Sequence, residues 1–434
     1  MTQRLGPKQV SGRQGTSGSA GADAVLVPLI APYSLWREHD RGVYCTVVAQ
    51  NYLSQALALY SSIRSTEPDR QVVILVLDAD RSDLAATRPN LKCVGTEVLS
   101  LTPRAVHELA AIYDVVEFAT AIKPLFVKAL LSEFEYVVYL DPDTYLVSPL
   151  VELPPLMKNE GIVLTPHFLE AIPPGESYIT EVHSLALGIH NLGFCAFSRA
   201  AVPFLNWWWS HLERECLVYP LLGLFVDQKW TDVGAVLFNA HSIKHYGYNV
   251  GPWNLHERAF AQKDGRLVME RTGEELRFFH FSGFTPSDPD AISERLNMAL
   301  EQTSLKSTGL AVLSRQYADE LQKAIAELGE VSGYRFDRDT EGRRLTKRTR
   351  RAYRRELLRN SSGTLPSPFL PGDAGAFRKW RMRSIGSRTV AIIADLSIAL
   401  KYVFPDQYEQ FRRSAKGPFR RLRVMLLDAS RMRR

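Results

Sequence analysis

Residues 136–147 read Y-V-V-Y-L-D-P-D-T-Y-L-V and decide the fold of this chain. The first five are β-branched, aliphatic or aromatic, which is the composition of a strand buried on both faces of a parallel sheet. Pro142 has no backbone N–H for a strand ladder, so pairing is expected to stop at Asp141. Asp141 and Asp143 are therefore predicted at the carboxyl end of a buried strand, where open α/β sheets bind their ligands.

Two carboxylates separated by one residue suit a hard divalent cation, because both can face the ion or share its water shell. A cation that also holds phosphate oxygens makes a nucleoside diphosphate a better leaving group. The alternative is a solvated Asp-Pro-Asp turn that only closes the strand, since both residue types are common in turns.

The composition is that of a globular protein. The 434 residues are 45% hydrophobic and 23% charged, which is typical of soluble chains with two or three domains. No stretch approaches the apolar length that spans a bilayer, and residues 1–40 lack the pattern of a secretory signal. The widely spaced cysteines form no CxxC pair, so we expect a cytoplasmic protein with reduced thiols. They are Cys45, Cys93, Cys195 and Cys216.

The charge is distributed unevenly. Residues 341–434 hold 24 Lys and Arg against 7 Asp and Glu, a net charge of +17, which leaves 29 against 40, or −11, for residues 1–340. An acidic body with a basic tail predicts an anionic partner for the tail, either a membrane surface or nucleic acid. Nucleic acid is the weaker alternative, because no motif that reads bases or clamps a nucleic-acid backbone is present.

Apolar residues are interleaved with the charges of this tail, and residues 390–402 have the pattern of an apolar helix too short to span a bilayer comfortably. Basic residues with Trp and Leu are typical of helices on an anionic leaflet, so we expect peripheral attachment at the inner membrane face. The alternative is a solvated helical appendage or an oligomerisation arm. The interleaved residues are Leu357, Leu358, Phe377, Trp380, Met382 and Ile385.

The first half predicts a parallel sheet. Strand-like residues 43–48 are followed by a helical pattern over 52–64 and a second strand over 72–77, the plan of a βαβ unit. Residues 91–99 predict a further strand. Residues 104–134 are mostly helical, with a new helix at Lys123-Pro124, because proline is tolerated in a first turn.

The second half supplies a third candidate metal ligand. Phe278 and Phe279 predict a buried strand that delivers His280 to a loop. Two carboxylates with one imidazole suit Mn²⁺ or Mg²⁺ better than a thiolate-seeking metal. The alternative is an imidazole that is merely hydrogen-bonded at a strand end.

In order, the motifs resemble the GT-A glycosyltransferases of family eight type, the group of glycogenin and the bacterial lipopolysaccharide galactosyltransferases. The resemblance is carried by Y-L-D-P-D, N-L-G, F-V-D-Q-K-W, Y-N-V-x-x-W-N-L-H-E-R and F-F-H-F-S-G-F, and it covers about residues 43–290. It is nearer to the bacterial relatives found among surface-polysaccharide genes. It implies an α/β, GT-A (Rossmann-like) fold with a mixed, mainly parallel sheet flanked by helices, and the charge pattern after residue 340 adds a basic helical C-terminal extension.

Composition, charge and the resemblance together predict a domain plan. Residues 1–40 would be a disordered leader, 41–150 the nucleotide-sugar-binding half, and 151–290 the acceptor-binding half. Residues 291–330 would be a helical segment and 331–434 the basic tail.

Site residues are carried over position by position. Asp141, Asp143 and His280 would bind Mn²⁺ (or Mg²⁺) beside the diphosphate of a nucleotide-sugar donor. Asp227 would hydrogen-bond the donor sugar, and Gln228 would lie beside its anomeric carbon. The remaining donor-binding positions are Ala49, Asn51 and Tyr52 against the nucleoside, Lys123 as a basic contact, Asn191 and Gly193 in a loop facing the sugar, and Gly283 at the diphosphate.

One motif departs from the family pattern. A Lys-Pro-Trp usually follows His-x-x-Gly and covers the diphosphate, but here Phe284-Thr285-Pro286-Ser287 follows Gly283. Lys123, Lys229 or Arg258 would have to compensate. An amide such as that of Gln228 is a poor nucleophile, so same-face attack by the acceptor, with retention, fits better than a covalent glycosyl-enzyme.

Aromatic clusters suggest the acceptor side. Trp253, Asn254, His256 and Glu257 are candidates to line it, although buried aromatics with polar neighbours also occur in plain cores, and Glu257 with Arg258 has the alternative of a surface pair. The run Trp207-Trp208-Trp209 favours core packing over a sugar platform, because consecutive helix positions point about 100° apart.

The sequence therefore predicts a metal-dependent glycosyltransferase that acts on a glycan or lipid-linked glycan acceptor. One rival is a sugar-phosphate nucleotidyltransferase, which needs a Gly-rich, basic loop after the first strand, whereas residues 49–52 read A-Q-N-Y. The other is a non-catalytic glycan-binding or scaffold protein on the same fold, against which the intact metal ligands argue.

Overall fold

The computed structural model describes residues 42–173, 179–296, 308–359, 364–384 and 406. Seven strands of the described residues form one mixed sheet in the order β10-β6-β7-β4-β1-β2-β3. All neighbours are parallel except β7, which runs antiparallel to both β4 and β6. The strands are β1 (Gly42–Val48), β2 (Gln71–Val76), β3 (Leu91–Val94), β4 (Tyr136–Leu140), β6 (Ile162–Pro166), β7 (His190–Ser198) and β10 (His241–Ser242).

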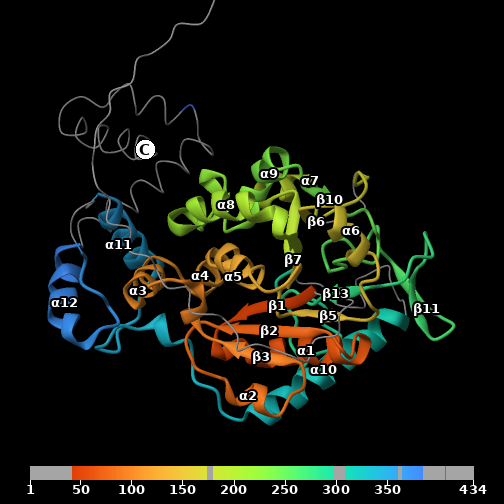
Figure 1. Cartoon of the computed structure of the whole chain (residues 1–434), viewed down its shortest axis with the longest axis horizontal. Coiled ribbons are helices and arrows are strands. Elements are labelled where there is room, and N and C mark those ends of the chain that lie inside the picture. Colours follow the sequence, from red (N-terminus) through yellow and green to blue (C-terminus); the bar gives the residue numbers. More distant parts are fainter. Residues whose placement is uncertain (1–41, 174–178, 297–307, 360–363, 385–405, 407–434) are drawn as a thin grey trace, which may run out of the picture.

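Helices cover both faces of the sheet, and side chains of β1 alternate between the two cores (Figure 1). Val43, Cys45 and Val47 pack with α3 (Pro103–Ile112), α4 (Val115–Ala121), α5 (Lys123–Leu130) and α8 (Val202–Glu215). Tyr44 and Val48 pack with α1 (Leu53–Thr66) and α6 (Leu153–Asn159) on the other face. The predicted fold class, a mainly parallel mixed sheet flanked by helices, is confirmed.

A short antiparallel ribbon extends the molecule beyond β4. It pairs β5 (Thr144–Leu146) with β13 (Phe278–His280) and packs on α10 (Thr308–Leu328) in a third core. Glu152 fastens this ribbon, because its carboxylate pairs with Arg277 at 2.6 Å and accepts the Tyr248 hydroxyl at 2.9 Å. The other short elements are α2 (Asp83–Ala86), α7 (Glu181–Leu187), β8 (Val218–Tyr219), β9 (Leu224–Phe225), α9 (Gln228–Leu237), β11 (Phe260–Lys263) and β12 (Arg266–Met269).

Several local predictions are confirmed, and two are corrected. Proline opens α5 at Lys123-Pro124 as expected, and the four cysteines are buried and unpaired. Trp208 is fully buried in the core, as the Trp run predicted. The strand predicted over 91–99 ends at Val94, because the Glu97 carboxylate accepts the Gly95 N–H at 2.8 Å and starts a 3₁₀ turn. The helical stretch 104–134 is divided, since Asp114 and Glu117 form a capping box that begins α4.

The first part of the basic tail belongs to the body. It contains α11 (Lys347–Arg359) and α12 (Ala374–Arg383), which lie beside α3 (Figure 1). Phe377 and Trp380 are buried in the same core as α3 and α5, so the expectation that they lie in a leaflet is wrong. The buried Arg350 guanidinium donates to the carbonyls of Tyr113, Phe336, Leu345 and Ala110, which ties the tail to the helical layer. Residues 390–402 and Ile385 lie outside the described residues, as does the leader over 1–40.

A second contact joins the tail to the sheet edge. Asp78 follows β2, and its two carboxylate oxygens accept the Gln50 N–H at 2.8 Å and the Arg335 N–H at 2.9 Å. The Gln50 side chain in turn donates to the Gly333 carbonyl at 3.2 Å. Residues 333–335 are therefore attached to the turn that follows β1.

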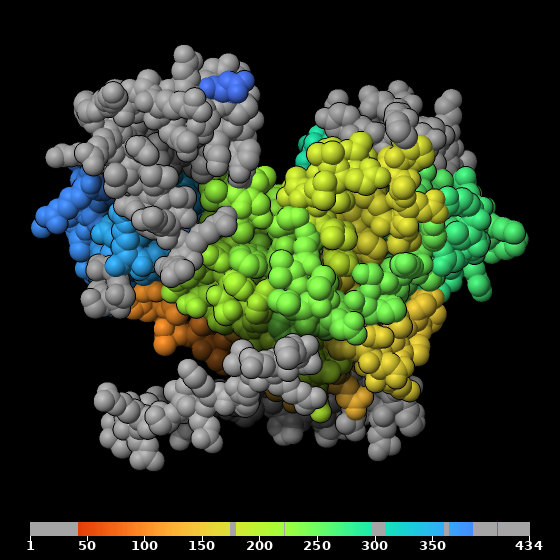
Figure 2. Space-filling model, turned by 90° about the horizontal axis from the view of Figure 1, so that it is seen from above, coloured from red at the N-terminus to blue at the C-terminus, as the bar shows by residue number. Residues whose placement is uncertain are grey.

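Viewed from above, the coloured surface is formed mostly by residues 150–270, with the blue residues of α11 and α12 at one edge and the β11–β12 hairpin at the opposite edge (Figure 2). Among the described helices, none combines the length and the apolarity needed to cross a bilayer.

Candidate metal centre and its surroundings

Two neighbouring parallel strands bring the predicted site together. β1 and β4 are paired, so the turns after them emerge at the same edge of the sheet. Ala49, buried, precedes the 3₁₀ turn Gln50–Tyr52, on which Asn51 is exposed and Tyr52 is 44% exposed. Burial raises the pKa of the Tyr52 phenol, and the nearby Asp143 and Asp141 carboxylates raise it further.

The Asp-Pro-Asp turn is shaped by its own backbone hydrogen bonds. The Asp141 N–H donates to the Gly193 carbonyl at 2.8 Å, which is the last bond of the β4–β7 ladder before Pro142. The Asp141 carbonyl accepts the Thr144 N–H at 3.0 Å and the Thr144 hydroxyl at 2.7 Å. The chain then enters β5, whose pairing with β13 sets His280 opposite Thr144.

Asp141, Asp143 and His280 form the metal-site candidate of the described residues, as the sequence predicted. One ligand atom of each lies within 4.8 Å of those of the other two. Ligands at the ~2.1 Å distance typical of Mg²⁺ lie at most about 4.2 Å apart, so a small side-chain movement would seat an ion. The carboxylates are 29% and 20% exposed, while the imidazole is 6% exposed, so the acids reach solvent and the ring forms the wall. The donor set fits a hard divalent cation.

Asp143 and His280 are paired directly. His280 Nε2 lies 3.1 Å from Asp143 Oδ1, and Nδ1 lies 3.1 Å from Asn249 Oδ1. Burial opposes ionisation of both groups, but their mutual attraction outweighs it, so the pKa of Asp143 is lowered and that of His280 is raised. Arg295 adds a smaller lowering of the pKa of Asp143.

Lys123 lies behind the acids rather than in the open site. Its ammonium is 2% exposed, 2.9 Å from Asp227 and 3.5 Å from Asp141, and it lies over the Tyr139 ring at 4.2 Å. Burial lowers the pKa of Lys123, but the two carboxylates reverse this and raise it above the ordinary value. Lys123 is thus a buried cation that joins two acids from distant parts of the chain.

Asp227 immediately precedes α9 and Gln228 is its first residue, and both are buried. Asp227 is 2% exposed and ion-paired with Lys123. The Gln228 amide accepts the Leu192 N–H at 3.2 Å and donates to the Leu187 carbonyl at 3.0 Å, so both of its ends hold main chain. Val226, a β-branched residue with φ 42°, adopts strained left-handed backbone just before them.

Asn191 and Gly193 lie in β7, not in a loop as predicted. Antiparallel pairing with β4 and β6 extends the strand over both residues, which their small and polar side chains did not indicate. Gly193 faces the metal ligand, because a Cβ built there would meet the Cε1 atom of His280 at 2.3 Å. The absence of a side chain therefore makes room for the imidazole.

The predicted acceptor residues are mainly internal. Trp253 is 8% exposed, and its ring packs edge-on against His280 with centroids 5.1 Å apart. Asn254 is fully buried, and Glu257 with Arg258 is a buried pair at 2.9 Å, so the surface-pair alternative is wrong. His256 is partly exposed beside Phe168, at 5.6 Å between ring centroids.

The structure brings one cation near the place of the missing lysine. Gly283 has φ 77° and the space beside it is occupied by Arg295, whose exposed guanidinium donates to the Ser282 hydroxyl at 3.2 Å. Lys229 pairs with Asp232 at 2.7 Å and Arg258 is buried, so neither is oriented to compensate. Arg295 lies beyond the motif, and no pattern in the sequence singled it out.

Other neighbours of the site were also missed. Tyr139 donates its hydroxyl to Asp141 at 2.9 Å, and its place two residues before the acid in a strand is a usable signal. Asn249 and His167 reach the site only through tertiary contacts, and no local pattern in the sequence indicates such contacts.

No family model matches the chain. Among solved structures, the bifunctional glycosyltransferase WbbM is 14% identical, with 67% of this chain and 53% of that chain covered and a TM-score of 0.39. The galactosyltransferase LgtC in complex with donor and acceptor sugar analogues is 15% identical, with 67% and 97% covered and a TM-score of 0.37. Likenesses at this level do not bear on what the chain does.

Two curated relatives come from Bacillus subtilis (strain 168). The uncharacterised protein YfnD is 21% identical over 252 residues, 56% of this chain and 78% of the relative. The uncharacterised protein YfnF is 33% identical over 259 residues, which are 56% of this chain and 81% of the relative. With a third of the aligned positions identical across four fifths of that relative, the chain belongs to the same family as YfnF.

Proposed function

We propose that this protein is a metal-dependent glycosyltransferase that moves a sugar from a nucleotide-sugar donor to a glycan or lipid-linked glycan acceptor. The observation that carries the proposal is the Asp141, Asp143 and His280 cluster at the carboxyl end of β4, beside the turn that ends β1. The sequence resemblance to GT-A enzymes of family eight type points the same way.

The chain supplies groups for each part of such a donor. Tyr52 and Asn51 are exposed on the turn after β1, where a nucleoside would lie. Arg295 is exposed beside Gly283 and would offset negative charge on the diphosphate. When bound to the two acids and the imidazole, Mn²⁺ or Mg²⁺ would stabilise charge on the departing diphosphate.

The reaction we propose retains the anomeric configuration. The bond between the anomeric carbon and the β-phosphate oxygen breaks, and the electron pair stays on the diphosphate. The acceptor hydroxyl forms the new bond on the same face and gives its proton to the departing phosphate oxygen. Asp227 is paired with Lys123, and both ends of the Gln228 amide are occupied, so neither is available as a nucleophile. A trapped sugar adduct on Asp227 would overturn this route.

A thermal-shift screen of nucleoside diphosphates and their sugars, with and without Mn²⁺, tests the proposal. A ligand that binds only the folded state raises Tm by mass action. We expect one nucleotide to stabilise the parent in the presence of Mn²⁺, and to fail with Asp143→Asn. Asp83→Asn is the matched control, because Asp83 is an exposed acid on α2 paired with Arg81.

Turnover then separates the rivals. The parent should hydrolyse its sugar nucleotide slowly without acceptor, and Asp143→Asn should lose at least about tenfold of that rate. An equal rate in Asp143→Asn overturns the proposal. Stabilisation by sugar nucleotide without any turnover indicates the non-catalytic rival, and release of pyrophosphate from a nucleoside triphosphate indicates the nucleotidyltransferase.

A further inference from the structure

A continuous chain of side-chain hydrogen bonds runs away from the back of His280. Its Nδ1 lies 3.1 Å from Asn249 Oδ1, and Asn249 Nδ2 lies 3.1 Å from Asn191 Oδ1. Asn191 Nδ2 lies 3.3 Å from His167 Nε2, and His167 Nδ1 ends the chain 3.2 Å from the Ile189 carbonyl. Its four side chains come from four separate segments, namely β13, the turn at Asn249, β7 and the residue after β6, and its first member is the imidazole of the metal cluster.

The donors and acceptors in this series of hydrogen bonds all point in one consistent direction. A carbonyl only accepts, so His167 must carry its proton on Nδ1 and accept the Asn191 amide N–H at Nε2. Burial lowers the pKa of His167 to about 4, which keeps this ring neutral near pH 7. Asn191 Oδ1 then accepts from Asn249 Nδ2, and Asn249 Oδ1 faces His280. An acceptor at that place requires a proton on Nδ1 of His280.

Independent contacts fix both amide orientations. Asn191 Oδ1 also accepts the Gly193 N–H at 2.9 Å, which it does only with its oxygen on that side. The two N–H groups of Asn249 Nδ2 also serve the Thr165 hydroxyl at 2.8 Å and the Asn191 carbonyl at 3.2 Å, so one N–H is shared between two acceptors. Neither amide can turn over without losing these bonds. The direction of this hydrogen-bond series is therefore set by the Gly193 N–H and the Asn191 carbonyl, and Thr165 accepts from Asn249 because its own hydroxyl donates to the Asn191 carbonyl at 3.1 Å.

We propose that Asn249, supported by Asn191 and His167, is a positioning residue that holds His280 with its proton on Nδ1 and its Nε2 directed at the divalent cation. The inference rests on the proposed function, because it requires the cluster to bind a metal. Its consequence is that the affinity for the cation depends on side chains that never touch it.

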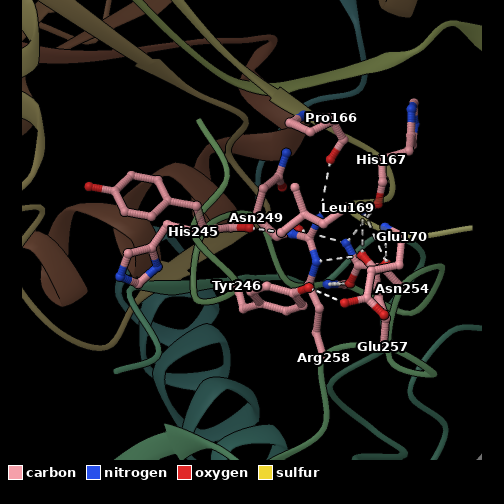
Figure 3. Close-up of polar contacts among 12 residues, drawn as sticks. Pro166, His167, Leu169, Glu170, His245, Tyr246, Asn249, Asn254, Glu257 and Arg258 are labelled. Atoms are coloured by element: carbon pink, nitrogen blue, oxygen red, sulfur yellow. Dashed lines mark hydrogen bonds and ion pairs between the residues drawn. The ribbon is translucent and has the colours of Figure 1, made fainter. Parts of the chain in front are cut away.

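The turn over residues 253–258 holds the backbone at two members of this series, His167 and Asn249 (Figure 3). Asn254 Nδ2 donates to the carbonyls of His167 at 3.2 Å and Asn249 at 3.1 Å. Arg258 donates to the carbonyls of Tyr248 at 2.6 Å and Pro166 at 3.4 Å, the residues that immediately precede these two. One turn thus holds two of the four backbone segments that present the hydrogen-bonding side chains, those of His167 and Asn249.

Glu257 completes this fastening on one side. Its carboxylate accepts the N–H groups of Leu169 and Glu170 at 3.0 Å each and pairs with Arg258. The motif W-N-L-H-E-R, which the sequence assigned to the acceptor, thereby acts as a scaffold for the metal ligand. Trp253 covers the chain from one side, with its ring 6.1 Å from that of His167.

Titration of the protein with Mn²⁺, followed by the EPR signal of free Mn²⁺, gives the first test. Asn249→Gly removes the acceptor for Nδ1 and tolerates the φ of 51°. We expect its Kd for Mn²⁺ to rise about 10- to 100-fold, the usual effect of losing an outer partner of a metal-bound histidine. Asn239→Gly is the matched control, because Asn239 is exposed after α9 with φ 52°, and its Kd should equal the parent's.

A second variant tests whether the hydrogen bonds beyond Asn249 contribute. His167→Phe keeps a ring against Trp253 but removes both hydrogen bonds, so Kd should rise by a smaller factor than with Asn249→Gly. Because His167 acts through Asn249, adding His167→Phe to Asn249→Gly should change Kd no further. Independent, additive effects would mean two packing defects and would overturn the inference. This variant also keeps the inference testable if Asn249→Gly does not fold.

Nitrogen NMR of ¹⁵N-histidine protein with Mg²⁺ gives a signature that packing alone would not change. The parent should show His280 with a solvent-protected proton on Nδ1, and Asn249→Gly should lose that protection. A parent that binds no Mn²⁺ overturns the inference together with the proposed function. A parent that loses Mn²⁺ with Asp143→Asn, but not with Asn249→Gly, overturns the inference alone.

Discussion

Gly193 leaves space for the His280 ring because it has no side chain. It lies in β7 directly against the His280 ring, and a Cβ there would meet Cε1 at 2.3 Å and Nδ1 at 2.4 Å. Gly193→Ala must therefore displace the imidazole or the strand. We expect the Kd for Mn²⁺ to rise at least about tenfold, as for the loss of an outer partner of a ligand, in the EPR titration described above.

Gly161→Ala is the control for that substitution. A Cβ at Gly161 would meet its nearest atom, the Cβ of Ala200, at 3.5 Å, which is an ordinary contact. Its Kd should match that of the parent. Equal Kd values for Gly193→Ala and the parent would mean that His280 is not a ligand.

At the scale of single residues, the sequence predicted what is local. Asp141 and Asp143 were found because a strand-like run precedes them and a proline separates them. His280 was found because Phe278 and Phe279 mark its strand. The partners of these groups were not found. Asn249 and His280 meet through a hydrogen bond across 31 positions, and Lys123 meets Asp227 only in the folded core. No periodicity encodes such pairs.

The β5–β13 ribbon depends on one ionised group. Burial would raise the pKa of Glu152, but hydrogen bonds from His245, Arg277 and Tyr248 outweigh it and lower that pKa to about 2. A carboxyl whose pKa is lower in the folded state stabilises above its unfolded pKa of about 4.3, and this contribution is lost as the pH falls towards about 2.

We therefore expect Tm to fall between about pH 5 and pH 3, and Glu152→Gln to fall less steeply over that range. The measurement is thermal unfolding followed by circular dichroism at each pH. Glu133→Gln is the comparison, because burial raises the pKa of Glu133 and removing its charge should not flatten the profile. Identical slopes for the parent and Glu152→Gln would remove Glu152 from the fastening of the ribbon.

Elements were predicted well where a periodic pattern governs them and less well where tertiary pairing does. The helix beginning at Lys123 follows from proline in its first turn. By contrast, residues 91–99 form only a short strand, because the Glu97 side chain competes for the backbone at Gly95. Asn191 and Gly193 extend β7 because strands lie on both sides of them, which their own propensities oppose.

At the scale of the whole molecule, the basic tail divides into two parts with different expected roles. Residues 331–384 contribute buried side chains such as Phe336 and Arg350 to the core. Residues 385–434 hold 11 Lys and Arg against 4 Asp and Glu, and for them attraction to an anionic surface stays a prediction. A chain that ends after Ser384 should keep the parent's Tm and donor hydrolysis, whereas a chain that ends before Val331 should unfold at a clearly lower temperature.

Vesicle sedimentation checks the surface part of this prediction. The full chain should bind vesicles that contain anionic lipid and not neutral vesicles, and the chain ending at Ser384 should bind markedly less. If both chains bind anionic vesicles equally, the last fifty residues are not the attachment.

The Asp78 carboxylate, which accepts the N–H groups of Gln50 and Arg335, couples the stability of the turn after β1 to that of the segment at Arg335. Because one carboxylate binds both, a ligand that stabilises the turn also stabilises the segment. The coupling free energy is the same whether the turn or the segment is stabilised first. A nucleotide seated at that turn would therefore protect the peptide bonds near residue 335 from proteases. Loosening the segment would, in return, weaken the grip on the nucleotide by the same factor, although the two lie 283 positions apart along the chain at Gln50 and Gly333.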